Sequence, residues 1–173
     1  MNDCLEDQRK AALAAWDANQ LAESYRLWLP LADAGEVEAQ AQIGSCLLCS
    51  LHRYESFEQL NSGNGPVIDE ATRTADKEQA VLYLEAASAA GNGPASFNLA
   101  GHYAVGCKSG TWEERKTRAA ELYALAHAQG FMAFSYMLSG TAPGQPYLDA
   151  IEEQMMTDEK LPPPDWWHGA SCE

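Results

Sequence analysis

The sequence predicts an all-α protein with one domain, and three observations support this fold class. Alanine, the strongest helix former, accounts for 29 of the 173 residues. Strand-favouring residues are scarce, with four valines and three isoleucines, which also argues against the buried parallel sheet of α/β enzymes. The third observation is a pattern of helix, glycine turn and helix that recurs three times along the chain.

The charge of the chain narrows the classes of partner. Eleven basic residues stand against 25 acidic ones, which gives a net charge of −14. Such a surface repels phosphate backbones and anionic lipids, so we expect no nucleic-acid partner and no membrane partner. No run of 18 apolar residues is present, and no membrane span is expected. The acidic N-terminus is unlike a signal peptide, and we expect a cytoplasmic protein.

Three glycines, Gly35, Gly91 and Gly130, anchor the repeated pattern. Large residues stand seven positions before each anchor, and mostly apolar residues stand four and eight positions after it. This spacing is that of an amphipathic helix. Each glycine is expected to end one helix in the left-handed conformation before the next begins. The positions concerned are Trp28, Leu84 and Tyr123 before the anchors and Ala39, Ala95, Phe134, Ile43, Leu99 and Leu138 after them.

The apolar spacing, together with the glycine and proline positions, predicts where each helix lies. A small residue nine positions after each anchor should let a neighbouring helix approach closely, and in the first copy this residue is Gly44. Pro94 suits the first turn of its helix, whereas Pro30 should kink the helix that contains it or lie near a distortion. The expected helices cover residues 4–18, 21–34, 37–50, 76–90, 94–106, 112–129, 131–140 and 145–157.

The connection between the first two anchors is the longer one. The anchors are 56 and then 39 residues apart, so 17 extra residues fall at about 50–75. We expect an inserted surface loop there, with a short helix near 54–60. The helical domain is expected over 1–157, followed by a tail rich in proline and tryptophan over 158–173.

The residues around the anchors resemble the SEL-one-like repeat family, a branch of the tetratricopeptide-like α-solenoids. The resemblance covers about residues 20–140 and implies a right-handed α–α superhelix, a short solenoid of about three helix-turn-helix repeats with flanking helices. The family pattern combines a small residue, an aromatic pair, paired alanines and a glycine, followed by Ala, Leu-Gly, Tyr and a closing Gly. The best match is Ala80, Tyr83-Leu84, Ala86-Ala87, Gly91, Ala95, Leu99-Ala100, Tyr103 and Gly106.

The resemblance also implies binding without catalysis. Family members act as adaptors that hold other proteins, and bacterial members include immunity proteins that neutralise toxins. We therefore expect a non-enzymatic module that binds a protein or peptide, of basic or mixed charge, in a concave groove. A dedicated inhibitor or immunity protein for a bacterial toxin is the alternative within the binding class. Superposition on tetratricopeptide relatives directs six residues towards the groove: Glu38, Ser45, Leu48, Phe97, His102 and Tyr136.

Cys46, Cys49 and His52 form the one pattern that suggests metal or redox chemistry. Their spacing places all three along one helix face. Structural zinc sites usually draw ligand pairs from two segments, however, and the other cysteines form no second pair. Burial in the core of a helix is the preferred interpretation, and no cofactor is expected. A metal- or redox-active protein is the alternative outside the binding class.

Two further features near the C-terminus have two interpretations each. Trp166 and Trp167 follow three consecutive prolines, and they either pack back onto the last helices or anchor a partner. The acidic stretch over 152–159 is interpreted as a solvated face, with attraction of a basic partner as the functional alternative.

Overall fold

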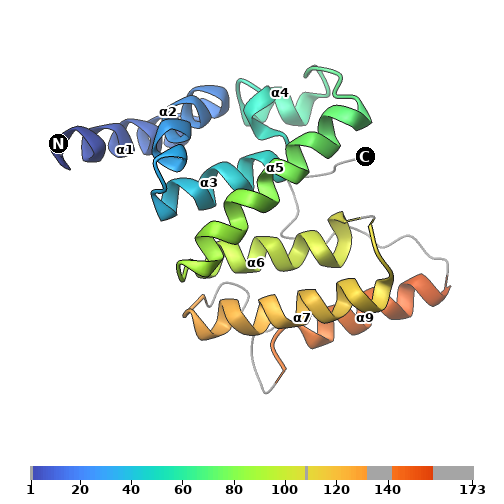
Figure 1. Ribbon diagram of the computed structural model, residues 1–173. Coiled ribbons are helices and arrows are strands. Elements are labelled where there is room, and N and C mark those ends of the chain that lie inside the picture. The colour runs from blue at the N-terminus through green and yellow to red at the C-terminus, as the bar shows by residue number, and fades with distance from the viewer. Residues whose placement is uncertain (1, 108, 132–141, 158–173) are drawn as a thin grey trace.

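The computed structural model describes residues 2–107, 109–131 and 142–157, and within them every regular element is a helix, as expected (Figure 1). A 3₁₀ turn, η1 (Leu51–Arg53), and a π-helical turn, η2 (His102–Gly106), join some of the helices. None of the described helices combines the length and apolar character that a membrane span requires. The α-helices are α1 (Asn2–Asp17), α2 (Leu21–Asp33), α3 (Val37–Leu48), α4 (Phe57–Ser62), α5 (Glu70–Ala89), α6 (Gly93–Gly101), α7 (Trp112–Ala128) and α9 (Gln145–Thr157).

Most of the expected helix boundaries agree with the structure to within two residues. Two helices differ more. α5 begins at Glu70, six residues earlier than expected, and α6 ends at Gly101, where the π-helical turn takes over. α2 continues through Pro30 to Asp33. All but the first residue of the helix expected over 131–140 lie outside the described residues.

Apart from the short helix α4, the helices from α1 to α7 pack side by side in chain order. α1 contacts α2, α2 contacts α3, α3 contacts α5, α5 contacts α6 and α6 contacts α7. Figure 1 shows this succession, from the blue α1 and α2 to the orange α7. The most extensive of these contacts joins α3 to α5, across the inserted segment. Contacts between sequence neighbours are what a stack of helix pairs requires.

The three anchor glycines end their helices with the same pair of hydrogen bonds. Gly35, Gly91 and Gly130 have φ angles of 87°, 94° and 81°, in the region that favours glycine. Each glycine N–H donates to the carbonyl three residues back, and the next N–H donates to the carbonyl five residues before it. This is the Schellman ending of a helix. A further copy ends α1, where Asn19 takes the left-handed conformation with φ 60°.

Side-chain caps then start the following helices. Glu36, Asp69, Asn92 and Thr111 each accept a hydrogen bond from the backbone N–H three residues on. Glu114 completes a capping box by accepting the backbone N–H of Thr111. Each cap satisfies a donor that the first helical turn leaves without a partner. The cap at Asp69 explains why α5 starts so early.

The apolar stripes of these helices form two hydrophobic clusters. One joins α1, α2, α3 and α5 and contains Trp28, whereas the other extends from α3 through α5, α6 and α7 to α9 and contains Leu84 and Tyr123. The three side chains are 2%, 0% and 0% exposed, as their positions before the anchors predict. Leu48 packs against both clusters. Burying a large apolar side chain contributes roughly 1.5–3 kcal/mol to folding.

The inserted segment contains more helix than the loop expected at 50–75. It holds η1, α4 and the first turns of α5. Arg53 donates two hydrogen bonds to the carboxylate of Asp76, at 2.8 and 2.7 Å. Ser50 Oγ donates to the same carboxylate at 2.8 Å. The start of the insertion is therefore fastened to α5, and α4 corresponds to the short helix expected near 54–60.

Candidate functional site

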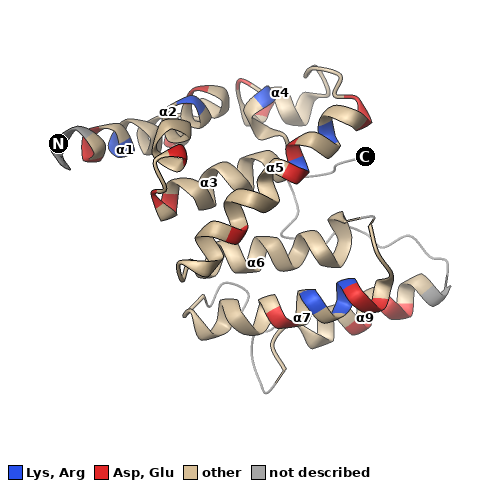
Figure 2. Cartoon of the chain, viewed as in Figure 1, with Lys and Arg blue, Asp and Glu red and all other residues tan. Residues whose placement is uncertain are grey.

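Negative charge dominates the described surface because acidic side chains outnumber basic ones, and most of the basic side chains are already paired. Figure 2 shows acidic residues on most helices, whereas α6 carries no charge. Many carboxylates are left without a cation, in keeping with the net charge of −14. Ion pairs among the described residues include Arg9–Glu36, Lys10–Glu6, Arg26–Glu23, Arg53–Asp76, Lys116–Asp149, Lys116–Glu152 and Arg118–Glu121.

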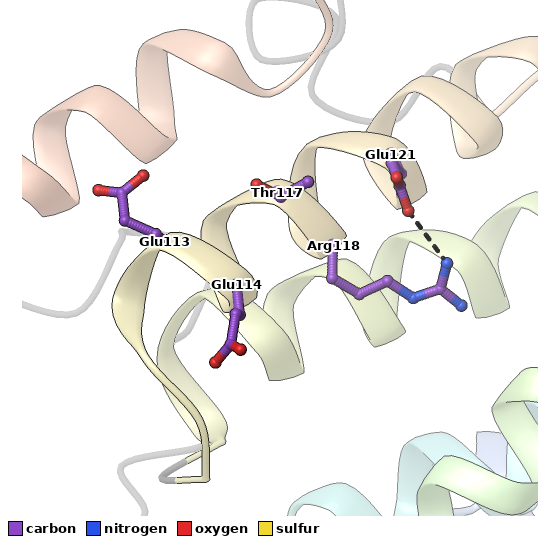
Figure 3. Close-up of a pocket in the computed structure, with 5 residues that line it drawn as sticks. All are labelled: Glu113, Glu114, Thr117, Arg118 and Glu121. Atoms are coloured by element: carbon purple, nitrogen blue, oxygen red, sulfur yellow. Dashed lines mark hydrogen bonds and ion pairs between the residues drawn. The ribbon is translucent and has the colours of Figure 1, made fainter.

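A shallow, open hollow of about 470 Å³ lies along the outer face of α7. Figure 3 shows Arg118 reaching along the helix towards Glu121, with Glu113 and Glu114 on the preceding turns. The Arg118 guanidinium and the Glu121 carboxylate are 3.2 Å apart. Glu114 is engaged in the capping box, and hydrogen bonds from Thr111 hold its pKa below the usual value. Thr117 completes the lining.

A second depression of about 350 Å³ adjoins the first between α5 and α7, and we call it the α5–α7 cleft. Leu99 and Leu122 line it as buried residues, and Leu125 is 40% exposed. Glu85 and Glu121 bring carboxylates to it from α5 and α7 respectively. It therefore combines apolar surface with acidic side chains. The residues that line the cleft are Glu85, Ser88, Ala89, Leu99, Arg118, Glu121, Leu122 and Leu125.

The helices on either side of the cleft, α5 and α7, lack a hydrogen bond that joins the preceding pair, α2 and α5. Between α2 and α5, the Tyr83 hydroxyl donates to the Asp33 carboxylate at 2.5 Å. Asp33 stands two residues before its anchor glycine, and Tyr83 stands eight before the next one. The corresponding residues between α5 and α7 are Ala89 and Leu122, which cannot form this hydrogen bond. Both line the cleft.

A buried hydrogen-bond network fixes the helix ends around the cleft. The hydroxyls of Ser88 and Ser96 lie 2.7 Å apart. Gln129 accepts from Ser96 Oγ at 2.6 Å and donates to the Ser88 carbonyl at 2.8 Å. Three helices are thereby joined at one point, since Ser88 belongs to α5, Ser96 to α6 and Gln129 caps α7. These hydrogen bonds therefore hold together the ends of the helices that surround the cleft.

The residues expected in the groove fall in different surroundings. Glu38 is exposed beside Arg9. Ser45 accepts a hydrogen bond from Asn98 at 2.7 Å and so joins α3 to α6. Leu48 is half-buried between the two clusters. Tyr136, Trp166 and Trp167 lie outside the described residues.

Phe97 is a core residue, 4% exposed, and its ring packs against Tyr123 and Phe131 at centroid distances of 5.5 and 5.1 Å. It offers little surface to a partner. The expectation that it faces an open groove fails because the aromatic rings of α7 and the following turn cover it.

His102 opens the π-helical turn η2 and is half-buried. Burial, with a smaller contribution from Lys77, lowers its pKa to about 4. The imidazole is therefore neutral at neutral pH. Its Nδ1 atom is buried without a hydrogen-bond partner in the described part of the chain.

Cys46, Cys49 and His52 are not assembled into a metal site. No group of three His, Cys, Asp or Glu side chains is placed to hold a metal ion in the ranges that the structure describes. Cys46 is 4% exposed, and burial raises its pKa to about 12, so it is held as a thiol. The His52 ring stacks on the Tyr25 ring, with the two ring centroids 4.7 Å apart. Cys46 is thus a core residue, as the preferred interpretation had it.

Glu85, Arg118, Glu121 and Leu125 line the cleft but belong to none of the patterns that the sequence shows. One signal was available for Leu125. The buried stripe of α7 runs through Ala119, Leu122, Tyr123 and Ala126, and Leu125 falls outside it. A leucine off the stripe marks apolar surface that the fold itself does not cover. No comparable signal marks Glu85, because it meets α7 only through the fold.

Comparison with known proteins adds no assignment. No protein-family model matches the sequence, and no curated protein or solved structure shows significant similarity. The function must therefore be inferred from the geometry of this chain.

Proposed function

We propose that the chain is a non-enzymatic protein-interaction module, a short α-solenoid of the SEL-one-like type that binds a segment of another protein. The matching hydrogen bonds at Gly35, Gly91 and Gly130 support a repeated helix pair. So does the packing, in chain order, of α1, α2, α3, α5, α6 and α7. Stacked helix pairs offer extended surfaces, which such proteins use for binding.

The α5–α7 cleft is the observation that carries this proposal. It is partly open to solvent, with exposed side chains at its rim, whereas pockets for small molecules enclose most of their ligand. Its apolar floor and carboxylate rim have the make-up of a surface for another protein. Leu125 lies 40% exposed at its edge, available for contact.

We place the binding surface on the α5–α7 side instead of the α3–α6 side expected from the resemblance. Phe97 is enclosed in the core, and the Ser45 hydroxyl is already bonded to Asn98. The α5–α7 side instead keeps exposed apolar and acidic side chains.

Affinity capture with matched leucine variants tests the proposal. Leu125→Asp changes the cleft, whereas Leu82→Asp changes a leucine of α5 that is 68% exposed and does not line it. The wild-type chain and Leu82→Asp should retain the same protein from a lysate of the source organism, and Leu125→Asp should lose it. Equal retention by the two variants, or no specific protein retained by the wild type, would contradict the proposal. Circular dichroism confirms that both variants fold.

A further inference from the structure

We infer that the α5–α7 cleft takes a basic amphipathic helix, whose cationic side chains pair with Glu85 and Glu121 while an apolar side chain covers Leu125. This inference rests on the proposed function, because it names the partner of that same surface. It joins three properties of the cleft: its charge, its apolar edge and its position between two helices.

The charge of the cleft calls for a cation. Within the described residues, no basic side chain pairs with Glu85. The one cation that lines the cleft, Arg118, is bound to Glu121 at 3.2 Å. Both members of that pair are exposed, with 45% and 61% of their side chains accessible, so it is a weak pair that a partner can exchange. Glu113 and Glu114 extend the negative surface along α7 (Figure 3).

The apolar edge of the cleft requires the partner to carry an apolar side chain as well as a cation. Leu125 is 40% exposed beside the buried Leu99 and Leu122. A purely polar cation would leave this leucine in water, whereas a leucine-sized side chain on the partner would cover it. The partner therefore carries basic and apolar side chains on neighbouring positions.

A helix is the form of partner that the cleft favours. The described residues contain no strand, so no sheet edge is offered for an extended peptide to join. The walls of the cleft are two helices, held by the network of Ser88, Ser96 and Gln129. A third helix can lie along such a groove with apolar residues three and four positions apart facing the floor.

Titration with designed peptides tests the inference. The probe is an amidated alanine-based peptide of about 16 residues, long enough to form a helix, with leucines on one face and flanking arginines. Its matched controls replace the arginines by glutamines or by glutamates. Binding is followed by NMR shifts of the ¹⁵N-labelled protein. The arginine peptide should bind tightest, weaken with added salt and shift the amides of Ala89 and Leu125 more than those of α1.

Two charge reversals on α5 locate the contact. Glu85→Lys should weaken the arginine peptide about tenfold, as expected for loss and reversal of a contacting charge. Glu78→Lys makes the same change of net charge at an exposed position outside the cleft and should weaken it far less. Equal weakening by both variants, or shifts centred on other helices, would overturn the inference.

The remaining outcomes separate this inference from the proposed function. Equal binding of the arginine and glutamine peptides at the cleft would overturn the cationic partner and leave protein binding there intact. Capture that depends on Leu125, with none of the peptides binding, would overturn the helical partner but keep the proposed function.

Discussion

A Cβ atom placed on Gly44 would lie 2.6 Å from Cγ of Leu84, so α3 and α5 touch where only a hydrogen fits. The Ala80 carbonyl oxygen would lie 3.2 Å from the same Cβ atom, and Leu84 is fully buried. Neither helix can therefore move aside to accommodate the extra atom.

Gly44→Ala should therefore destabilise the fold by roughly 1–3 kcal/mol, since overpacking outweighs the better helix propensity of alanine. Urea unfolding measures the loss. Gly101→Ala is the matched control, because a Cβ there meets nothing within 4 Å in the same kind of helical setting. That variant should match the wild type or exceed it in stability. Equal effects of the two substitutions would refute the close contact.

Substitution of the helix-ending glycines should lower the stability of the fold for a different reason, namely backbone strain. A Cβ on Gly35, Gly91 or Gly130 meets no atom within 4 Å, so only the left-handed backbone is strained. Each change to alanine should cost about 1–2 kcal/mol. Each change to asparagine should cost less, because asparagine tolerates this conformation, as Asn19 does at the end of α1. Thermal unfolding distinguishes the two series, and identical losses would argue against the shared ending.

The ion pair between Arg53 and Asp76 predicts that the folded state loses stability in acid. Burial raises the pKa of Asp76, but the hydrogen bonds from Arg53 and Ser50 outweigh burial and leave it below the usual value. A carboxylate with a lowered pKa in the folded state stabilises above its unfolded pKa, and that contribution is lost as the pH falls below about 4.

Asp76→Asn should remove about 2 kcal/mol at pH 7, typical of hydrogen bonds to a charged group. The measurement is urea unfolding at pH 7 and pH 3, where the difference from wild type should narrow. Glu23→Gln is the control, since the Glu23–Arg26 pair is exposed and should contribute little. A constant difference at both pH values would contradict the assigned role.

His102 predicts a second pH dependence at milder acidity. Its pKa is lowered to about 4 by burial, so between about pH 6.5 and 4 the unfolded chain binds a proton that the folded chain does not. Stability must then fall with falling pH, by at most about 1.4 kcal/mol per pH unit. His52 adds to this slope, because burial also lowers its pKa. His102→Gln should flatten the slope, and an unchanged slope would contradict the burial of a neutral imidazole.

The sequence predicted those features of the fold that depend on local patterns. Gly35, Gly91 and Gly130 were assigned as helix ends because a left-handed ending is a property of a few adjacent residues. The burial of Trp28 and Tyr123 followed from helical spacing in the same way. The early start of α5 was missed because the residues after Glu70 are mostly polar and show no apolar stripe, although Asp69 caps them.

The candidate site was harder to predict because it depends on which residues meet across helices. Glu85 and Leu125 are far apart in the sequence, and their proximity requires the packing of α5, α6 and α7. Phe97 was misplaced for the same reason, since its burial depends on the rings of Tyr123 and Phe131. Periodicity shows that a residue faces a neighbour but does not identify that neighbour.

Photocrosslinking in cells of the source organism tests the binding surface most directly. A benzoylphenylalanine is introduced at Ala89, in the cleft, or at Glu78, an exposed position on the same helix outside it. We predict that a discrete protein is crosslinked from position 89, not from position 78, and that Leu125→Asp abolishes the crosslink. Crosslinking of the same protein from both positions, or from position 78 alone, would contradict a binding surface at the α5–α7 cleft.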